Sequence, residues 1–216
     1  MRTLRTAILI SGRGSNMEAL VKAASKKDFP AEIVLVLSNR PDAEGLKFAK
    51  KAGIPTVVVD HTKFESRDAF EEAIDENLKT AKTELVCLAG FMRVLNATFV
   101  NRWRDRILNI HPSLLPSFRG LHTHERVLEA GVKITGCTVH FVRPEMDDGP
   151  IIIQATVPVN PEDTVITLAA RVLEFEHKIY PKALKLVAEG KVKVAGGKAS
   201  ISSQKRVIKG ITNPST

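Results

Sequence analysis

Short, continuous apolar runs alternate along this chain with segments of helical periodicity, and this alternation restricts the fold more than any other feature. The apolar runs lie at residues 5–10, 33–37, 55–59, 85–88 and 107–110. Strands that are apolar throughout are buried on both faces. The helical segments lie between them, at 17–25, 42–52, 67–79 and 98–103. Helices between strands imply right-handed crossovers, so the sequence predicts an α/β fold with a mostly parallel, twisted sheet and helices on both faces.

The pattern changes in the C-terminal half of the chain. Residues 134–142 and 150–159 are strand-like and are separated only by a short loop, which predicts an antiparallel hairpin added to the sheet. A long helical segment follows at 164–189, with Pro181 as a candidate bend. We expect one domain over residues 1–190 and a basic C-terminal extension over 191–216, disordered beyond about residue 203.

The charge of the chain is concentrated in that extension. The net charge is +8, and six basic residues and no acidic ones lie between 191 and 216. No aromatic side chain interleaves them for base stacking, so no nucleic-acid partner is expected. No apolar run approaches the ~18 residues of a membrane span. The two cysteines, Cys87 and Cys137, are interpreted as free thiols in a reducing cytoplasm.

A glycine-containing turn at residues 11–16, with the sequence SGRGSN, follows the first strand. Glycines let backbone N–H groups approach an anion, and the following helix contributes positive charge at its N-terminus, where Ser15 or Asn16 is the expected cap. Met17 replaces the third glycine of a dinucleotide fingerprint, and no Gly-Lys-Ser/Thr of a P-loop follows. The turn predicts a phosphate site, or it serves only the packing of strand on helix.

Asn109 and His111 lie two residues apart at the end of the fifth run, so their side chains share one face of the strand. Ligands of open α/β sheets bind at this carboxyl end. The Asn amide can donate to an oxyanion, and the His can exchange a proton beside it. A structural histidine is the plain alternative.

Two adjacent carboxylates, Asp147 and Asp148, lie in the loop of the expected hairpin. Such a pair is commonly solvated, but one carboxylate folded over the site would support a cationic His111 and relay protons through water. A metal site that uses His122, His124 and His140 is a weaker alternative, because the H-T-H spacing alone is poor evidence. The segment 89–95 presents apolar side chains and free backbone groups, which suit a flat heterocycle.

These motifs, in this order and spacing, resemble the glycinamide ribonucleotide formyltransferase family. The resemblance covers about residues 6–190 and rests on SGRGSN, SNR, LAGFMRVL, NIHPSLLPSFRGLHTH, TGCTVHFV, MDDGPIIIQ and EHKIYP. It implies a Rossmann-like formyltransferase fold, with residues 1–100 binding the nucleotide phosphate and 101–190 carrying the folate site and the catalytic groups. The implied cosubstrate is 10-formyltetrahydrofolate, without a metal. The implied acceptor is glycinamide ribonucleotide, and the chain would act as a monomer or homodimer without a membrane partner.

The resemblance also assigns roles to individual residues. Asn109, His111 and Asp147 match the catalytic trio. The substrate-binding positions are Gly14, Ser15 and Asn16 for the phosphate and Glu176 for the ribose. The folate-binding positions are Met92, Arg93, Val94 and Leu95 for the pteridine ring, Asn109 beside it, and Arg67 near the glutamate tail.

Two positions depart from the family pattern. Leu173 stands where relatives carry a polar residue that touches the nucleotide, and Asp148 replaces a small residue after the catalytic Asp. A formyltetrahydrofolate hydrolase, which uses water as the acceptor, is the nearest alternative. A non-catalytic nucleotide-binding module that uses only the glycine turn is the alternative from another class.

Overall fold

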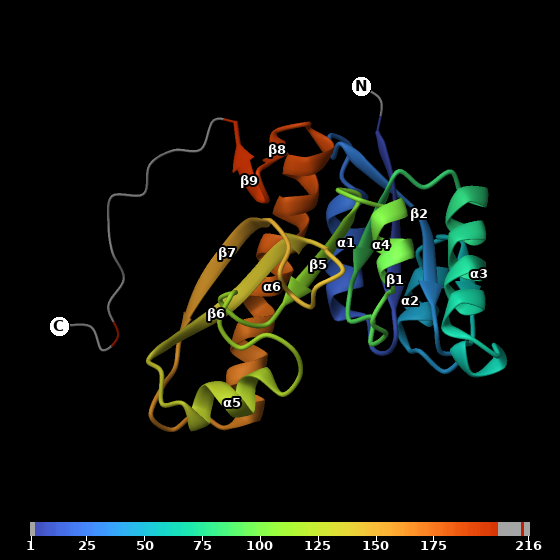
Figure 1. Ribbon diagram of the computed structural model, residues 1–216. Helices are drawn as coiled ribbons and strands as arrows, with labels where there is room; N and C mark the ends of the chain where they lie inside the picture. The colour runs from blue at the N-terminus through green and yellow to red at the C-terminus, as the bar shows by residue number, and fades with distance from the viewer. Residues whose placement is uncertain (1–2, 203–212, 214–216) are drawn as a thin grey trace.

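The computed structural model of the protein describes residues 3–202 and 213, and a seven-stranded sheet forms its centre (Figure 1). The spatial order of the strands is β3-β2-β1-β4-β5-β6-β7. Their bounds are β1 (Leu4–Ile10), β2 (Ala31–Ser38), β3 (Thr56–Val58), β4 (Leu85–Leu88), β5 (Ile107–His111), β6 (Ile134–Phe141) and β7 (Ile151–Pro158). The first five strands pair in parallel, whereas β6 is antiparallel to both of its neighbours. The predicted parallel sheet and its added hairpin are therefore confirmed.

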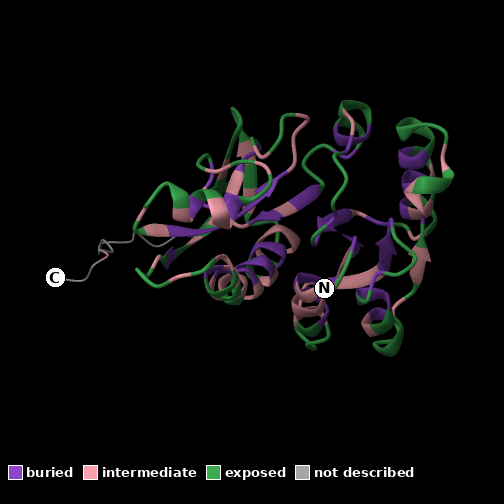
Figure 2. Cartoon of the chain, turned by 90° about the horizontal axis from the view of Figure 1, so that it is seen from below, coloured by how far each residue is buried: buried purple, intermediate pink, exposed green. Residues whose placement is uncertain are grey.

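Helices cover both faces of this sheet. Their bounds are α1 (Ser15–Ala24), α2 (Gly45–Lys51), α3 (Arg67–Thr80), α4 (Ala97–Arg102), α5 (Thr123–Glu129) and α6 (Val165–Ala188), with a short 3₁₀ turn η1 (His61–Lys63). One apolar cluster packs α1, α2, α5 and α6 on one face, and a second packs α3 and α4 on the other. In β1, Ile8 and Ile10 belong to the first cluster and Ala7 and Leu9 to the second. Figure 2 shows the buried strands between helices on both sides.

Three details differ from the sequence-based expectation. The N-cap of α1 is Gly14 and not Ser15 or Asn16, because its left-handed backbone, φ 77°, is the conformation that glycine tolerates best. The helix α5 was not predicted, and the segment after residue 190 forms a hairpin of β8 (Val192–Ala195) and β9 (Lys198–Ile201). The predicted long helix, in contrast, is confirmed as α6, which includes Pro181, and the bend there stays a prediction. The expected disorder beyond residue 203 concerns residues outside the described part of the chain.

The strand order creates a switch point between β1 and β4. The chain proceeds from β1 outward to β2 and β3, then returns to the other side of β1 to form β4 and β5. Loops that leave neighbouring strands in opposite directions open a crevice at their carboxyl ends, which is where α/β sheets bind ligands. Among the described residues, no helix is both long and apolar enough to cross a membrane.

Candidate active site

A first cavity lies at this switch point and has a volume of about 420 Å³. The loops after β1, β2, β3 and β4 form its wall, at residues 11–16, 39–40, 61, 89–90 and 92–93. The predicted phosphate-binding residues Gly14, Ser15 and Asn16 are all among them. The charged side chains in this wall belong to Arg13, Arg40 and Arg93, without an acidic residue. The cavity therefore favours an anion.

The backbone of the glycine turn brings the start of α1 close to the cavity. Gly14 has φ 77°, and a Cβ atom there would lie 3.0 Å from the Met17 Cε atom and 3.1 Å from the Gly45 Cα atom. Glycine therefore meets both a conformational and a steric need at this position. The N–H groups of the first helical turn have no partners within the helix and attract anions together with the helix dipole. This geometry suits a phosphate group.

Ser11 connects the glycine turn to the opposite wall of the cavity. Its backbone N–H donates to the Gly90 carbonyl at 3.2 Å, and its Oγ atom accepts from the Met92 N–H at 2.7 Å. The same hydroxyl donates to Asn39 Oδ1 at 2.5 Å. The His61 Nδ1 atom lies 2.9 Å from the Asn39 carbonyl. Sequence reasoning assigned no role to His61, which belongs to none of the motifs, or to Asn39, which lies in the SNR motif but received no function.

Glu176 is a buried neighbour of the first cavity and does not line it. Its Oε2 atom accepts a hydrogen bond of 2.6 Å from Asn16 Nδ2. Burial raises the pKa of this carboxyl group, and the Asn16 hydrogen bond partly opposes that shift. Helix α6 thus places an acid directly behind the glycine turn, where Asn16 is the side chain that separates it from the cavity.

The second cavity has a volume of about 560 Å³ and extends over β4, β5 and β6. It shares Gly90, Met92 and Arg93 with the first cavity, so one segment separates the two. The predicted folate-binding residues Met92, Arg93, Val94 and Leu95 line it together with Asn109. The Met92 and Val94 side chains are 67% and 59% exposed, which leaves apolar surface at the rim for a ligand to cover.

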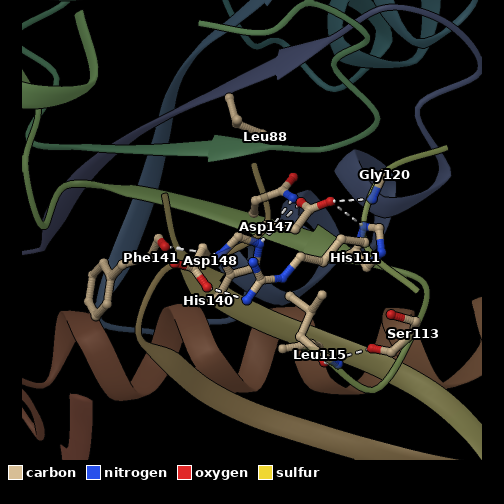
Figure 3. A network of polar contacts seen from close by, with 12 residues as sticks. Leu88, His111, Ser113, Leu115, Gly120, His140, Phe141, Asp147 and Asp148 are labelled. Atoms are coloured by element: carbon tan, nitrogen blue, oxygen red, sulfur yellow. Dashed lines mark hydrogen bonds and ion pairs between the residues drawn. The ribbon is translucent and has the colours of Figure 1, made fainter. Parts of the chain in front are cut away.

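The structure brings the predicted catalytic trio together at this cavity. Figure 3 shows two of its members, His111 and Asp147, facing each other. Asn109 and His111 project from the end of β5, and the loop between β6 and β7 carries Asp147 back over them. The Asp147 Oδ2 atom lies 3.4 Å from His111 Nδ1. The other ring nitrogen, Nε2, lies 2.9 Å from the Phe118 carbonyl and can only donate to it. His111 Nδ1 is therefore the nitrogen that is left to exchange a proton, and it faces a carboxylate.

His140 is a further member of the site that was considered in the sequence only as a metal ligand. Burial lowers the pKa of this histidine, so the neutral ring is favoured. The Nδ1 atom lies 2.9 Å from the Phe141 carbonyl, so it carries the proton, and Nε2 is an acceptor. Asn109 Nδ2 lies 3.3 Å from that acceptor. The neutral ring thus fixes the Asn109 amide and leaves its second N–H for a ligand.

The loop that carries Asp147 is held by contacts with the segment before α5. The Gly120 N–H donates to Asp147 Oδ2 at 2.9 Å, and Arg119 forms an ion pair with Asp148. Asp147 has φ 52°, which is uncommon for a residue other than glycine. The departure at Asp148 therefore adds a tie between the two loops without entering the trio.

Arg67 is the one predicted folate-binding residue that does not line the second cavity. It lies behind the cavity wall, where its Nη2 atom donates to the Val94 carbonyl. Its Nε atom donates to Glu71 Oε1 at 3.0 Å. Within the described part of the chain, no three His, Cys, Asp or Glu side chains are grouped so that they could hold a metal ion.

Comparisons with known proteins identify the family of this chain. The family model described as formyl transferase matches residues 4–184. The chain is 56% identical over 191 residues to the trifunctional purine biosynthetic protein adenosine-3 of Gallus gallus, covering 88% of this chain and 19% of that protein. It is 43% identical to the phosphoribosylglycinamide formyltransferase of Haemophilus influenzae, covering 88% of this chain and 90% of that protein.

A solved structure extends the likeness to three dimensions. The crystal structure of glycinamide ribonucleotide transformylase 1 from Symbiobacterium toebii has a TM-score of 0.90 and 45% identity, over 92% of this chain and 94% of that one. The similarity therefore extends across almost the whole of a single-function relative, whereas the chain spans about a fifth of the trifunctional protein. This chain belongs to the formyl transferase family and, within it, to the phosphoribosylglycinamide formyltransferases.

Proposed function

We propose that this chain transfers the formyl group of 10-formyltetrahydrofolate to the amine of glycinamide ribonucleotide in de novo purine biosynthesis. The products are formylglycinamide ribonucleotide and tetrahydrofolate. The observation that carries the proposal is the pairing of an anion-favouring cavity with a larger apolar one across a shared wall, beside Asn109, His111 and Asp147. One cavity suits a phosphorylated amine, and the other suits a flat heterocycle that carries the formyl group.

The second cavity has the size and lining that the cosubstrate needs. Its volume lies within the range of about 300–1,000 Å³ of small-molecule sites, and its exposed rim is apolar. Met92, Arg93, Val94 and Leu95 would receive the pteridine ring. In the first cavity Gly14, Ser15 and Asn16 would bind the phosphate. Glu176 would reach the ribose once Asn16 turns away from it.

The trio supplies electrostatic stabilisation and a path for one proton. As the amine attacks, the formyl oxygen gains negative charge, and Asn109 would donate its free N–H to it. A proton on His111 Nδ1, which lies 3.4 Å from Asp147 Oδ2, would place a positive charge beside the same oxygen. Removal of such a donor typically costs about 3 kcal/mol of transition-state stabilisation. Asp147 would then pass the proton of the attacking amine, through water, toward the departing folate nitrogen.

The same proposal assigns the parts of the chain. Residues 1–100 hold the nucleotide, and residues 101–190 hold most of the folate site and the catalytic groups, within one domain. Residues 191–216 form a basic extension, which begins with the β8–β9 hairpin. The two buried free cysteines fit a reducing compartment such as the cytoplasm.

The decisive test is the dependence of folate deformylation on the amine. The full chain is incubated with 10-formyltetrahydrofolate, and tetrahydrofolate formation is followed with and without glycinamide ribonucleotide. We expect tetrahydrofolate to form only when the nucleotide is present. The amounts of tetrahydrofolate and formylated nucleotide should then be equal. If deformylation proceeds equally well without the amine, the chain is a hydrolase and the transferase proposal is wrong.

A further inference from the structure

Glu71 is a buried carboxylate behind the wall of the second cavity, and the mechanism above does not use it. It lies in the second turn of α3, with its side chain 3% exposed. Its Oε1 atom accepts two hydrogen bonds, from Arg67 Nε at 3.0 Å and from the Asn96 N–H at 2.8 Å. Its Oε2 atom is buried and has no partner among the described residues. Burial of a partly satisfied carboxylate is costly, so Glu71 needs an explanation beyond packing.

The partner that Glu71 holds is the cation next to the cavity rim. Arg67 is 46% exposed, and two contacts fix its guanidinium: Nε on Glu71, and Nη2 on the carbonyl of Val94 in the cavity wall. The Nη1 group, with two donors, has no hydrogen-bond partner in the described part of the chain. A fixed guanidinium with unused donors binds a carboxylate with little further ordering.

We propose that Glu71 is a positioning residue that fixes Arg67 at the cavity rim for the carboxylates of the cosubstrate's glutamate tail. This inference rests on the proposed function. It assigns the preference of the site for a glutamate-bearing cosubstrate to Glu71, a buried residue outside the cavity. The shared Oε1 atom also holds the backbone at Asn96, directly after the segment that receives the ring. The Oε1 atom of Glu71 therefore fixes the position of Arg67, the proposed tail-binding cation, relative to residues 92–95, the proposed ring-binding segment.

Two neighbouring acids on α3 provide matched controls. Asp68 accepts from Asn96 Nδ2 at 2.7 Å, so it holds the same segment, but among the described residues its carboxylate forms no hydrogen bond or ion pair with the Arg67 guanidinium. Glu72 follows Glu71 directly and pairs with Arg102 at 2.9 Å. Loss of the Asp68 carboxylate tests the effect of loosening the segment, and loss of the Glu72 carboxylate tests the effect of one fewer charge on the helix.

The experiment measures how strongly this chain prefers a cosubstrate that carries the glutamate tail over one that lacks it. Formyl transfer is assayed with 10-formyltetrahydrofolate and with 10-formyltetrahydropteroate, which lacks the glutamate, and the ratio of the two kcat/KM values is the readout. We expect Glu71→Gln to lower this ratio by about tenfold, mainly through the KM of the tail-bearing cosubstrate. Glu72→Gln is expected to leave the ratio and the activity unchanged. Asp68→Asn should lower both kcat/KM values to a similar extent and keep their ratio.

A double-mutant cycle separates positioning from a general structural role. If Glu71 acts through Arg67, then Arg67→Ala lowers the ratio to a similar extent, and the double variant is no worse than either single variant. Glu71→Asp, which withdraws the charge by one methylene, gives an intermediate ratio and replaces Glu71→Gln if that variant does not fold. An unchanged ratio in the folded Glu71 variant, or additive losses, would overturn the inference. Failure of the proposed function is distinct, because the wild type would then transfer no formyl group.

Discussion

At the scale of single residues, proton positions decide what the site can do. His140 is a neutral acceptor because burial lowers its pKa and its Nδ1 proton is directed at the Phe141 carbonyl. Asn109 must therefore present an N–H and not its carbonyl oxygen to that ring. On the other side, Asp147 Oδ2 faces His111 Nδ1 at 3.4 Å, so a proton on that nitrogen would be directed at a carboxylate. The two histidines of the site thus differ in their surroundings: His140 orients an amide, whereas His111 faces a carboxylate.

The adjacent acids Asp147 and Asp148 make a matched pair for mutagenesis. We expect Asp147→Asn to lower kcat by about 10²–10³-fold, because it removes the charge that supports a cationic His111 and the acceptor for the relayed proton. Asp148→Asn removes only the ion pair with Arg119 on the exposed rim, so kcat should stay within about threefold. Steady-state assays of both variants check this. Equal losses would mean that the loop and not the carboxylate matters.

The sequence predicted the members of the trio but not the way they are fixed. Asn109 and His111 could be paired from their spacing on one strand, and Asp147 could be placed from its loop and from the family resemblance. The acceptor role of His140 depends on a tautomer that is set by the Phe141 carbonyl, and sequence spacing does not contain that information. Likewise, the burial of Glu71 depends on the packing of α3 against the segment at Asn96.

At the scale of elements, the loop between β6 and β7 depends on a glycine at its end. A Cβ atom on Gly149 would lie 1.7 Å from the Phe141 carbonyl oxygen. We expect Gly149→Ala to shift this loop, lower kcat by at least about tenfold through the displaced Asp147, and reduce the melting temperature. Activity assays and thermal melts check both effects. Gly53→Ala is the comparison for a glycine with open space around it, since its strain comes only from φ 72°.

The strands were easier to predict than the short helices and caps. Continuous apolar runs located β1, β2, β4 and β5 because burial on both faces leaves a strong signal in the sequence. Helix α5 has only seven residues, too few for a clear periodic pattern of apolar side chains. Its N-cap is His122 in a left-handed conformation, and histidine is not a usual N-cap residue. The Gly14 cap was missed for a similar reason, because Ser15 and Asn16 fit the usual N-cap preference better.

At the scale of the whole molecule, one buried and two partly buried histidines make stability depend on pH. Burial is the largest cause of the lowered pKa values of His124, His140 and His177. In the unfolded chain a histidine binds a proton near pH 6.5, whereas in the folded protein these three histidines bind it only at lower pH. The folded state therefore loses stability as the pH falls from about 6.5 toward the folded pKa values. Glu176, whose pKa burial raises, acts in the opposite direction at acidic pH.

A difference experiment isolates one of these groups. We expect the free energy of unfolding of the wild type to fall between pH 7.5 and 5.5. In His140→Gln the fall should be smaller, by no more than about 1.4 kcal/mol per pH unit for a single group. Urea unfolding at several pH values gives both slopes. Identical slopes would show that His140 binds its proton equally well in the folded and unfolded states.

In the proposed mechanism, charge on His111, beside Asn109 and Asp147, accelerates formyl transfer. The most direct test compares turnover and nucleotide affinity in His111→Gln, by assaying transfer and by titrating glycinamide ribonucleotide in a calorimeter. We expect kcat to fall by about 10²–10³-fold while the Kd for the nucleotide stays within about threefold, because the substitution leaves the glycine turn unchanged. A kcat close to that of the wild type would contradict this mechanism.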